Sequence, residues 1–441
     1  MKKSFTSFTR YFLRSSIVFL LSSPFVILLL TLQTRPTIPE NRPLTAREVS
    51  IVENLILSIA PESLSEPSLE DASLNTSDIN LLIRHSLRMS GLSNKWNARV
   101  STEERKIEST IDWRPLSEWM ALYVTVKGSF LHRNGRLYLD QLSIGKLQIP
   151  KSWTAQLVKI IETNTLNLST TFESIEQILK KVTIKSVADS KFQIQVIWEP
   201  ELISELSDQA QRLFISSEDQ ERIIRHYLVI NDLVTTISTD TRAISMSELL
   251  APTFEAAYEN SMAGADPQAE NRTLFQTLAV YVNNEDISKL LGRDTAAELP
   301  RARFIEVRLR RRQDLAQHVA SIAAITASLG PELAVLLSTT KETYDARYRS
   351  GFSFSDLTAN SVGVTLASLA MQNKTSAIEM QRRLSELEAE SDFMPEVGNN
   401  RDGISESAFN SIYADSSSSE YLERLNEIRE TIEAKPIFQG F

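Results

Sequence analysis

Cysteine is absent from the 441 residues of this chain. Its absence excludes disulfide bonds, thiolate metal sites, thiol nucleophiles and a lipid-modified N-terminal cysteine. Glycine is scarce as well, with 12 residues, so the chain has few left-handed turns and few loops suited to wrapping a phosphate group. Neither G-x-G-x-x-G nor G-x-x-x-x-G-K-S/T occurs, and we therefore expect no nucleotide cofactor.

Charge and motif content exclude further classes of function. Acidic residues outnumber basic ones, 56 to 47, and the net charge is −9. A nucleic-acid-binding protein needs a basic face, so we expect no nucleic-acid partner. The 4 histidines form no H-E-x-x-H pair, and no nucleophile elbow occurs. The sequence therefore identifies no reaction, and we expect neither a metal ion nor another cofactor.

One stretch near the N-terminus, residues 15–34, carries no charge and is flanked by Arg14 and Arg35. At about 1.5 Å per helical residue it is long enough for the ~30 Å hydrocarbon core of a bilayer. Residues 1–14 contain basic but no acidic residues, so they are predicted to stay cytoplasmic, with the rest of the chain in the periplasm of a bacterium. A cleaved signal peptide is the alternative, but the apolar stretch is longer and no A-x-A site follows it.

Two regions of different character follow a proline-containing linker, residues 35–46. Residues 47–200 mix helical periodicity with two-residue alternation, and Asn134-Gly135 between two alternating runs indicates a β-hairpin. From 201 to 441 only helical patterns are found. We therefore expect an α+β fold, with an antiparallel-sheet α+β domain at 47–200 and an all-α domain at 201–441.

Individual elements follow from periodicity, capping residues and turn residues. Thr45 is expected to cap the first helix. We expect helices at 46–60, 79–90, 153–164, 172–182 and 201–215, a strand at 191–200, and loops at 62–76 and 264–270.

Residues 313–370 are predicted to form three helices. The first ends at Gly330, because glycine ends helices and the proline that follows suits the first turn of the next one. The third can be capped by Ser355. It carries Asp356 and Asn360 one turn apart, on the same face.

A spaced polar pattern runs through these three helices. It consists of a histidine, a Lys-Glu-x-x-Asp segment, a Gly-Phe-Ser-Phe loop and an Asp-Leu-x-Ala-Asn-x-x-Gly helix start. Its residues are His318, Lys341, Glu342, Asp345, Gly351, Phe352, Phe354, Asp356, Asn360 and Gly363. The pattern resembles the signature of YfiM-like bacterial envelope proteins and, more loosely, that of VanZ-like membrane proteins. The resemblance implies an envelope location and a recurring polar cluster, but no reaction.

We expect His318, Glu342, Asp345, Asp356 and Asn360 to meet in one polar cluster. Glu342 and Asp345 lie one turn apart and either form ion pairs or hold a cation, for which His318 or Asp356 would supply a third ligand. His318 is either a buried imidazole bonded to a carboxylate or a catalytic group. The ion-pair interpretation is the simpler one. A basic stripe upstream, residues 308–312, either faces an anionic bilayer or pairs with the acidic C-terminal third.

Three functions remain open. The first is a membrane-anchored periplasmic protein that binds a lipid or an envelope protein in cell-envelope maintenance, with the α+β domain holding the ligand. The second is an envelope hydrolase or transferase in which His318 or Glu342, next to Asp345, is the general base. The third is a scaffold for membrane proteins that uses the charged C-terminal helices. Open space beside the cluster would favour the enzyme, and a sealed, fully hydrogen-bonded cluster would exclude it.

Overall fold

The computed structural model describes residues 30–39, 42–89, 92–103, 106–115, 121–133, 136–154, 156, 181–188, 190–201 and 215–441. These residues fall into two compact units. The first unit contains the described residues of Met1–Leu44 and Leu69–Ile197, and the second, here called the helical unit, contains those of Thr45–Ser68 and Trp198–Phe441.

Several predicted elements lie outside the described residues. They are the cytoplasmic segment 1–14, residues 15–29 of the predicted span, the hairpin turn at 134–135, and most of the helices expected at 153–164, 172–182 and 201–215. Toward the end of the predicted span, Leu32–Gln33 is a short strand, β1, and not part of a helix. Among the described residues, no helix is both long enough and apolar enough to cross a bilayer.

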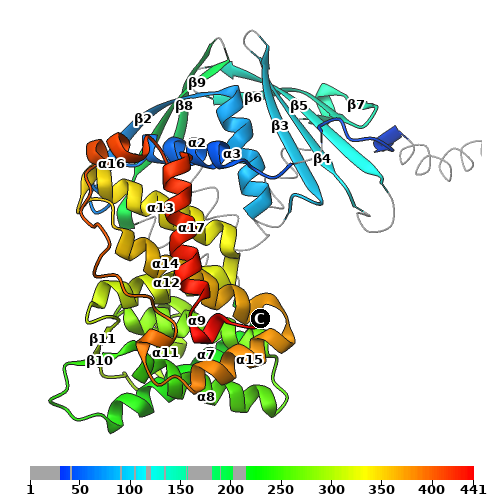
Figure 1. Cartoon of the computed structure of the whole chain (residues 1–441). Helices are drawn as coiled ribbons and strands as arrows, with labels where there is room; N and C mark the ends of the chain where they lie inside the picture. The colour runs from blue at the N-terminus through cyan, green and yellow to red at the C-terminus, as the bar shows by residue number, and fades with distance from the viewer. Residues whose placement is uncertain are drawn as a thin grey trace, which may run out of the picture. The chain divides into compact units, whose positions relative to one another are not determined.

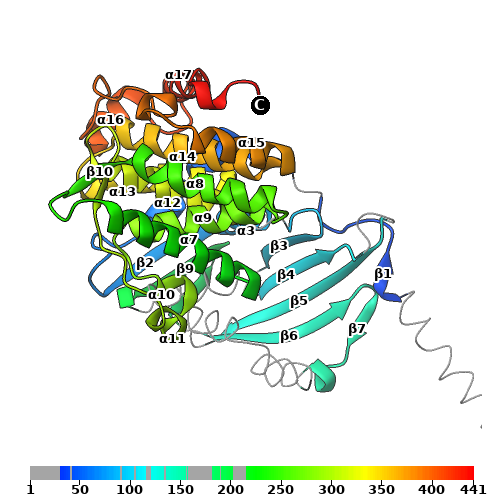
Figure 2. The same ribbon diagram turned by 90° about the horizontal axis from the view of Figure 1, so that it is seen from below.

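Two antiparallel sheets form the first unit, as expected for an α+β fold. The larger has the order β3 (Trp96–Glu103), β4 (Lys106–Trp113), β5 (Tyr123–Arg133), β6 (Arg136–Ile144) and β7 (Leu147–Ile149), with β1 paired to β5. Figure 2 shows these strands side by side in that order. The smaller has the order β2 (Ser68–Asn75), β9 (Lys191–Trp198) and β8 (Val182–Ala188). Helix α3 (Thr76–Met89) packs against β3.

The hairpin predicted from sequence is confirmed in its strands, because β5 and β6 pair from Val126 opposite Ile144 to Arg133 opposite Arg136. The strand predicted at 191–200 is β9. The prediction of a loop at 62–76 is wrong, since β2 occupies its second half. Only Ala72 and Leu74 are buried on β2, so its polar residues hide the two-residue alternation.

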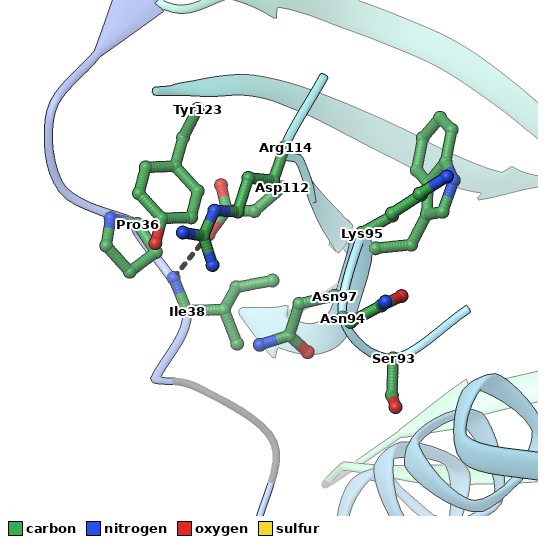
Figure 3. A pocket seen from close by; sticks show the side chains of 10 residues that line it. Pro36, Ile38, Ser93, Asn94, Lys95, Asn97, Asp112, Arg114 and Tyr123 are labelled. Atoms are coloured by element: carbon green, nitrogen blue, oxygen red, sulfur yellow. Dashed lines mark hydrogen bonds between the residues drawn. The ribbon is translucent and has the colours of Figure 1, made fainter. Parts of the chain in front are cut away.

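Part of the predicted linker 35–46 is docked on the larger sheet. The N–H of Ile38 donates a hydrogen bond to Asp112 Oδ2 at 2.7 Å, drawn as a dashed line in Figure 3. Asp112 is buried and accepts a second hydrogen bond, from the Thr125 hydroxyl at 2.5 Å. The chain is also held at Leu30, whose carbonyl accepts from the N–H of Lys146 at 2.8 Å. The chain after residue 30 therefore belongs to the sheet and is not a free tether.

Gly145→Ala is expected to destabilise the first unit. Gly145 has φ +59°, and an added Cβ would lie 2.5 Å from the Leu30 carbonyl oxygen and 2.6 Å from that of Thr31. The left-handed conformation alone costs a side chain about 1–2 kcal/mol, and the clash adds to it. The control is Gly264→Ala, where φ is +109° but no described atom lies within 4 Å of the added Cβ. Thermal unfolding should show a larger loss for Gly145→Ala, and equal losses would contradict the close approach.

The helical unit is mainly α-helical, as expected, but the all-α description is wrong in one detail. A two-stranded parallel sheet pairs β10 (Ala243–Ser245) with β11 (Glu306–Arg308). The helices are α2 (Ala46–Ser58), α7 (Ser217–Thr236), α8 (Met246–Met262), α9 (Pro267–Val282), α10 (Ser288–Leu291), α11 (Arg293–Ala297), α12 (Gln313–Leu329), α13 (Pro331–Tyr348), α14 (Phe354–Gln372), α15 (Lys374–Ser385), α16 (Glu406–Tyr413) and α17 (Ser419–Glu433). Helix α2, expected in the α+β domain, packs against α13 and belongs to the helical unit.

Helix ends follow their capping residues. Thr45 and Glu48 form the capping box of α2, which confirms the predicted cap at Thr45. The loop predicted at 264–270 is wrong in its second half, because Asp266 caps α9 and Pro267 occupies its first turn. The predicted cap Ser355 is also wrong, since Ser353 accepts the hydrogen bond from the N–H of Asp356 at 3.0 Å.

Helices α12, α13 and α14 lie next to one another, with α17 beside them (Figure 1). Gly363 of α14 allows a close approach to α12, because an added Cβ would lie 2.7 Å from the Val319 carbonyl oxygen of α12. The start of α14 is packed against an aromatic cluster, in which the ring of Phe352 lies 4.6 Å from that of Phe409 and 5.1 Å from that of Phe354. These contacts fix the three helices that carry the predicted polar cluster.

Candidate functional site

The five residues predicted to form a polar cluster come from three neighbouring helices. His318 lies on α12, Glu342 and Asp345 on α13, and Asp356 and Asn360 on the first two turns of α14. One ligand-type atom from each of His318, Glu342 and Asp356 lies within 4.8 Å of the other two. Asp345 is bound instead to Lys341, whose Nζ lies 2.8 Å from Asp345 Oδ2.

His318 is held at both ring nitrogens. Its Nδ1 lies 2.9 Å from Asn360 Oδ1, and its Nε2 lies 3.4 Å from Asp356 Oδ2. Burial alone would lower the pKa of His318, but the nearby carboxylate of Asp356 outweighs it, so the pKa is raised above its ordinary value. The side chains of His318 and Asp356 are still 12% and 16% exposed, so solvent reaches this side of the cluster.

Glu342 is fully buried, and no cation lies close enough to compensate its negative charge well. Its nearest side-chain cation, Lys341 Nζ, is 3.5 Å from Oε1, and the N–H of Ser353 is 3.3 Å from Oε2. Burial raises the pKa of Glu342 to about 7, and the charge of Lys341 only partly offsets this. A buried carboxyl group with only distant partners is typical of a functional site, because a carboxylate in a structural ion pair has a cation close to it.

Arg312 and Asp402 also belong to the cluster, although neither was among the residues predicted to form it. Arg312 bridges three carboxylates, with contacts of 2.6 Å to Asp314, 3.0 Å to Asp356 and 3.2 Å to Asp402. Nearby, Arg310 pairs with Glu396 at 2.7 Å. The basic stripe at 308–312 is thus partly paired with the C-terminal third. No local pattern signals Asp402, because it reaches the cluster from a loop 46 residues after Asp356.

The predicted loop residues Gly351, Phe352 and Phe354 hold the start of α14 in place. Gly351 has φ +92°, and an added Cβ would lie 2.5 Å from the backbone of Gly403. Phe352 exchanges backbone hydrogen bonds with Ile404 at 2.7 and 3.0 Å, and both phenylalanines are buried. These residues therefore position Asp356 and do not contribute polar atoms to the cluster.

A pocket of about 340 Å³ adjoins the cluster through Asn360. Its walls come from α2, α13, α14 and α17 and include apolar side chains such as Val335, Val364 and Leu425. Three buried polar atoms on its lining residues have no hydrogen-bond partner among the described residues: Ser338 Oγ, Asn360 Nδ2 and Tyr421 OH. The cluster is therefore neither sealed nor fully hydrogen-bonded, and unsatisfied polar groups in an apolar pocket indicate a place for a ligand.

A second group of buried charges in the helical unit shows what a compensated network looks like. Glu270 is fully buried but lies 2.9 Å from Arg225, 3.3 Å from Arg222 and 3.3 Å from His226. Burial raises the pKa of Glu270, yet the hydrogen bond and charge of His226 and the charge of Arg225 outweigh it and hold the pKa below its ordinary value. Glu270 is thus the partner of His226, 44 residues away in the sequence. This network has the close cations that Glu342 lacks.

The first unit has a pocket of similar volume, about 340 Å³, drawn in Figure 3. It is lined by polar residues together with Pro36, Ile38 and Trp96, and the guanidinium of Arg114 lies 5.8 Å from the ring centre of Tyr123. Asp112, at its base, holds Ile38 of the docked segment. We interpret this pocket as part of the contact between the sheet and residues 36–38.

Comparison of this chain with protein-family models, with curated proteins and with solved structures finds no match. The site must therefore be interpreted from its own chemistry. That chemistry is an apolar pocket with three unpartnered polar groups, joined at Asn360 to a partly open cluster of one histidine and several carboxylates.

Proposed function

We propose that this chain is a single-pass protein of a bacterial inner membrane that acts by binding an amphipathic, lipid-type ligand in cell-envelope maintenance. The apolar stretch 15–34, up to the point where β1 joins the larger sheet, would be the anchor, with residues 1–14 in the cytoplasm and both units in the periplasm. The charge pattern of residues 1–34 supports the anchor and its orientation. The resemblance of residues 313–370 to YfiM-like envelope proteins supports the location.

The pocket of the helical unit is the observation that carries the binding proposal. Its volume of about 340 Å³ lies at the lower end of the range found for ligand pockets. Apolar walls suit a hydrocarbon chain, and the free hydrogen-bonding groups of Ser338, Asn360 and Tyr421 suit a polar head group. Arg429, exposed on the same lining, would favour an anionic head. We expected the ligand in the α+β domain, and the proposal places it in the helical unit instead.

Filling the pocket should abolish binding. Val364→Phe adds an aromatic ring to a pocket wall, so the full chain should bind a fluorescent fatty acid at least 10-fold more weakly than the wild type. Leu337→Phe is the control, because Leu337 lies on α13 with 42% of its surface exposed and is not a wall residue. Fluorescence titration of both variants, with unchanged melting temperatures, measures the difference. Equal affinity in the two variants would reject the pocket as the binding site.

An envelope hydrolase or transferase is the second candidate, and the half-open geometry around His318 favours it. The contacts to Asn360 and Asp356 orient the imidazole as they would a general base. Turnover of an ester-linked amphiphile by the full chain, lost in His318→Asn, would support the enzyme. Saturable binding with no product would support the binding protein.

A further inference from the structure

We propose that His318, Glu342 and Asp356 bind one divalent transition-metal ion of the zinc type. This inference rests on the polar cluster alone and does not depend on the proposed lipid-type ligand. Each of the three residues comes from a different helix, and their ligand atoms lie within 4.8 Å of one another. From the sequence we expect no metal ion, and a cation between Glu342 and Asp345, with His318 or Asp356 as a third ligand, is only the alternative to ion pairs.

The spacing between His318 and Asp356 suits a shared ion better than a direct hydrogen bond. His318 Nε2 and Asp356 Oδ2 are 3.4 Å apart, longer than the 2.7–2.9 Å of a charge-assisted hydrogen bond. Two ligand atoms on a tetrahedral centre with bonds of about 2.1 Å are separated by about 3.4 Å. A small movement of Glu342 would bring the third atom to bonding distance, since all three already lie within 4.8 Å.

The neighbouring residues orient the ligands as metal sites require. Asn360 Oδ1 is an acceptor, so the 2.9 Å contact places the ring proton of His318 on Nδ1 and leaves the lone pair of Nε2 facing the carboxylates. Arg312 holds Asp356 through Oδ1 at 3.0 Å, which leaves Oδ2 for an ion. Lys341 is closer to Asp345, at 2.8 Å, than to Glu342, at 3.5 Å. Thus His318 and Asp356 each have one atom fixed and one atom available, and Glu342 is held only by contacts of 3.3 and 3.5 Å.

The charge of the cluster also calls for a cation. Its ion pairs join five carboxylates to only two permanently charged side chains. The carboxylates are Asp314, Glu342, Asp345, Asp356 and Asp402, and the cations are Arg312 and Lys341. With neutral imidazole, the form that binds metal, three negative charges remain uncompensated. A divalent ion would neutralise two of them, which is a strong attraction in a largely buried site.

The donor set selects the kind of ion. One imidazole nitrogen and two carboxylate oxygens, without thiolate, match zinc sites with three protein ligands, and the fourth position is then left for water or a ligand group. Calcium and magnesium prefer six or more oxygen ligands, which three residues including a histidine do not supply.

Zinc titration of the full chain tests the proposal. The chain is prepared without a histidine tag, stripped with EDTA, and titrated with ZnCl2 in competition with a chromogenic chelator. We expect one site per chain, at least a 10-fold loss of affinity in His318→Gln, and a melting temperature that zinc raises in the wild type. Glu388→Gln is the control, because it removes an exposed carboxylate outside the cluster, and it should keep the affinity within about 3-fold.

A second measurement uses only the wild-type chain, so a variant that fails to fold cannot affect it. Co2+ added to the stripped wild type should give a saturable visible absorption typical of low-coordinate nitrogen and oxygen ligation, and one equivalent of zinc should remove it. The absence of saturable binding to the stripped wild type would overturn the proposal. Equal losses in His318→Gln and Glu388→Gln, with both variants folded, would overturn it as well.

Discussion

Glu342→Gln should stabilise the metal-free chain by about 3 kcal/mol at pH 8 and flatten its dependence on pH. The folded state holds the pKa of Glu342 at about 7, against an ordinary value of 4.5. One pKa unit corresponds to about 1.4 kcal/mol, and Glu342 is fully buried, so solvent screening does not reduce the effect. Glutamine has nearly the same shape and never ionises. The largest gain in the free energy of unfolding is therefore expected where the carboxyl group would be charged.

The sign follows from proton binding. Below about pH 4.5 the carboxyl group is protonated in both the folded and the unfolded chain. Between pH 4.5 and 7 the folded chain binds more protons, so its stability falls as the pH rises. The raised pKa of His318 acts in the same direction, since stability from a protonated imidazole is lost as the pH passes its folded value. Urea unfolding in EDTA at pH 5 and pH 8 measures the difference.

The control for Glu342→Gln is Glu388→Gln, which neutralises an exposed glutamate and should change stability by less than about 0.5 kcal/mol. If Glu342→Gln destabilises the chain at both pH values, Glu342 is a structural ion-pair partner of Lys341. A stabilised variant that has lost zinc binding would identify Glu342 as a residue kept for function at the expense of stability.

Gly363→Val should destabilise the helical unit by about 3 kcal/mol or more. An added Cβ would lie 2.7 Å from the Val319 carbonyl oxygen and 3.1 Å from the Ala323 nitrogen, and both are backbone atoms of α12 that cannot rotate away. Overpacking of this kind costs about 1–3 kcal/mol for small insertions, and the branched side chain adds two more methyl groups. Gly398→Val is the control, because no described atom lies within 4 Å of its Cβ.

Gly363→Val should also weaken zinc binding. Val319 follows His318 on α12, and Gly363 lies one turn after Asn360 on α14, so separating the helices stretches the 2.9 Å contact between His318 and Asn360. Urea unfolding and zinc titration of the two glycine variants measure both effects. Equal stability of Gly363→Val and Gly398→Val would contradict the close packing of α12 and α14.

Much of the fold could be predicted where local chemistry is strong. Asn134-Gly135 and its alternating flanks predict the β5–β6 pairing, and Thr45 predicts the start of α2. Strands β3, β4 and β8 were not predicted, since their polar residues obscure the alternation. Strands β10 and β11 have three residues each, too few to show any period.

The candidate site could be predicted only within each helix. The one-turn spacing of Asp356 and Asn360 places them on one face of α14, and the structure brings His318 and Glu342 to that face. The pocket could not be predicted, because α2 and α17 come from opposite ends of the helical unit's sequence. Its location depends on tertiary packing, which no pattern of spacing reveals.

Native mass spectrometry of the full chain, purified from membranes in a mild detergent, tests the central claim most directly. The account predicts one amphiphile bound per wild-type chain, absent from Val364→Phe and present in Leu337→Phe. A wild-type chain without a bound amphiphile, or the same occupancy in Val364→Phe, would contradict it.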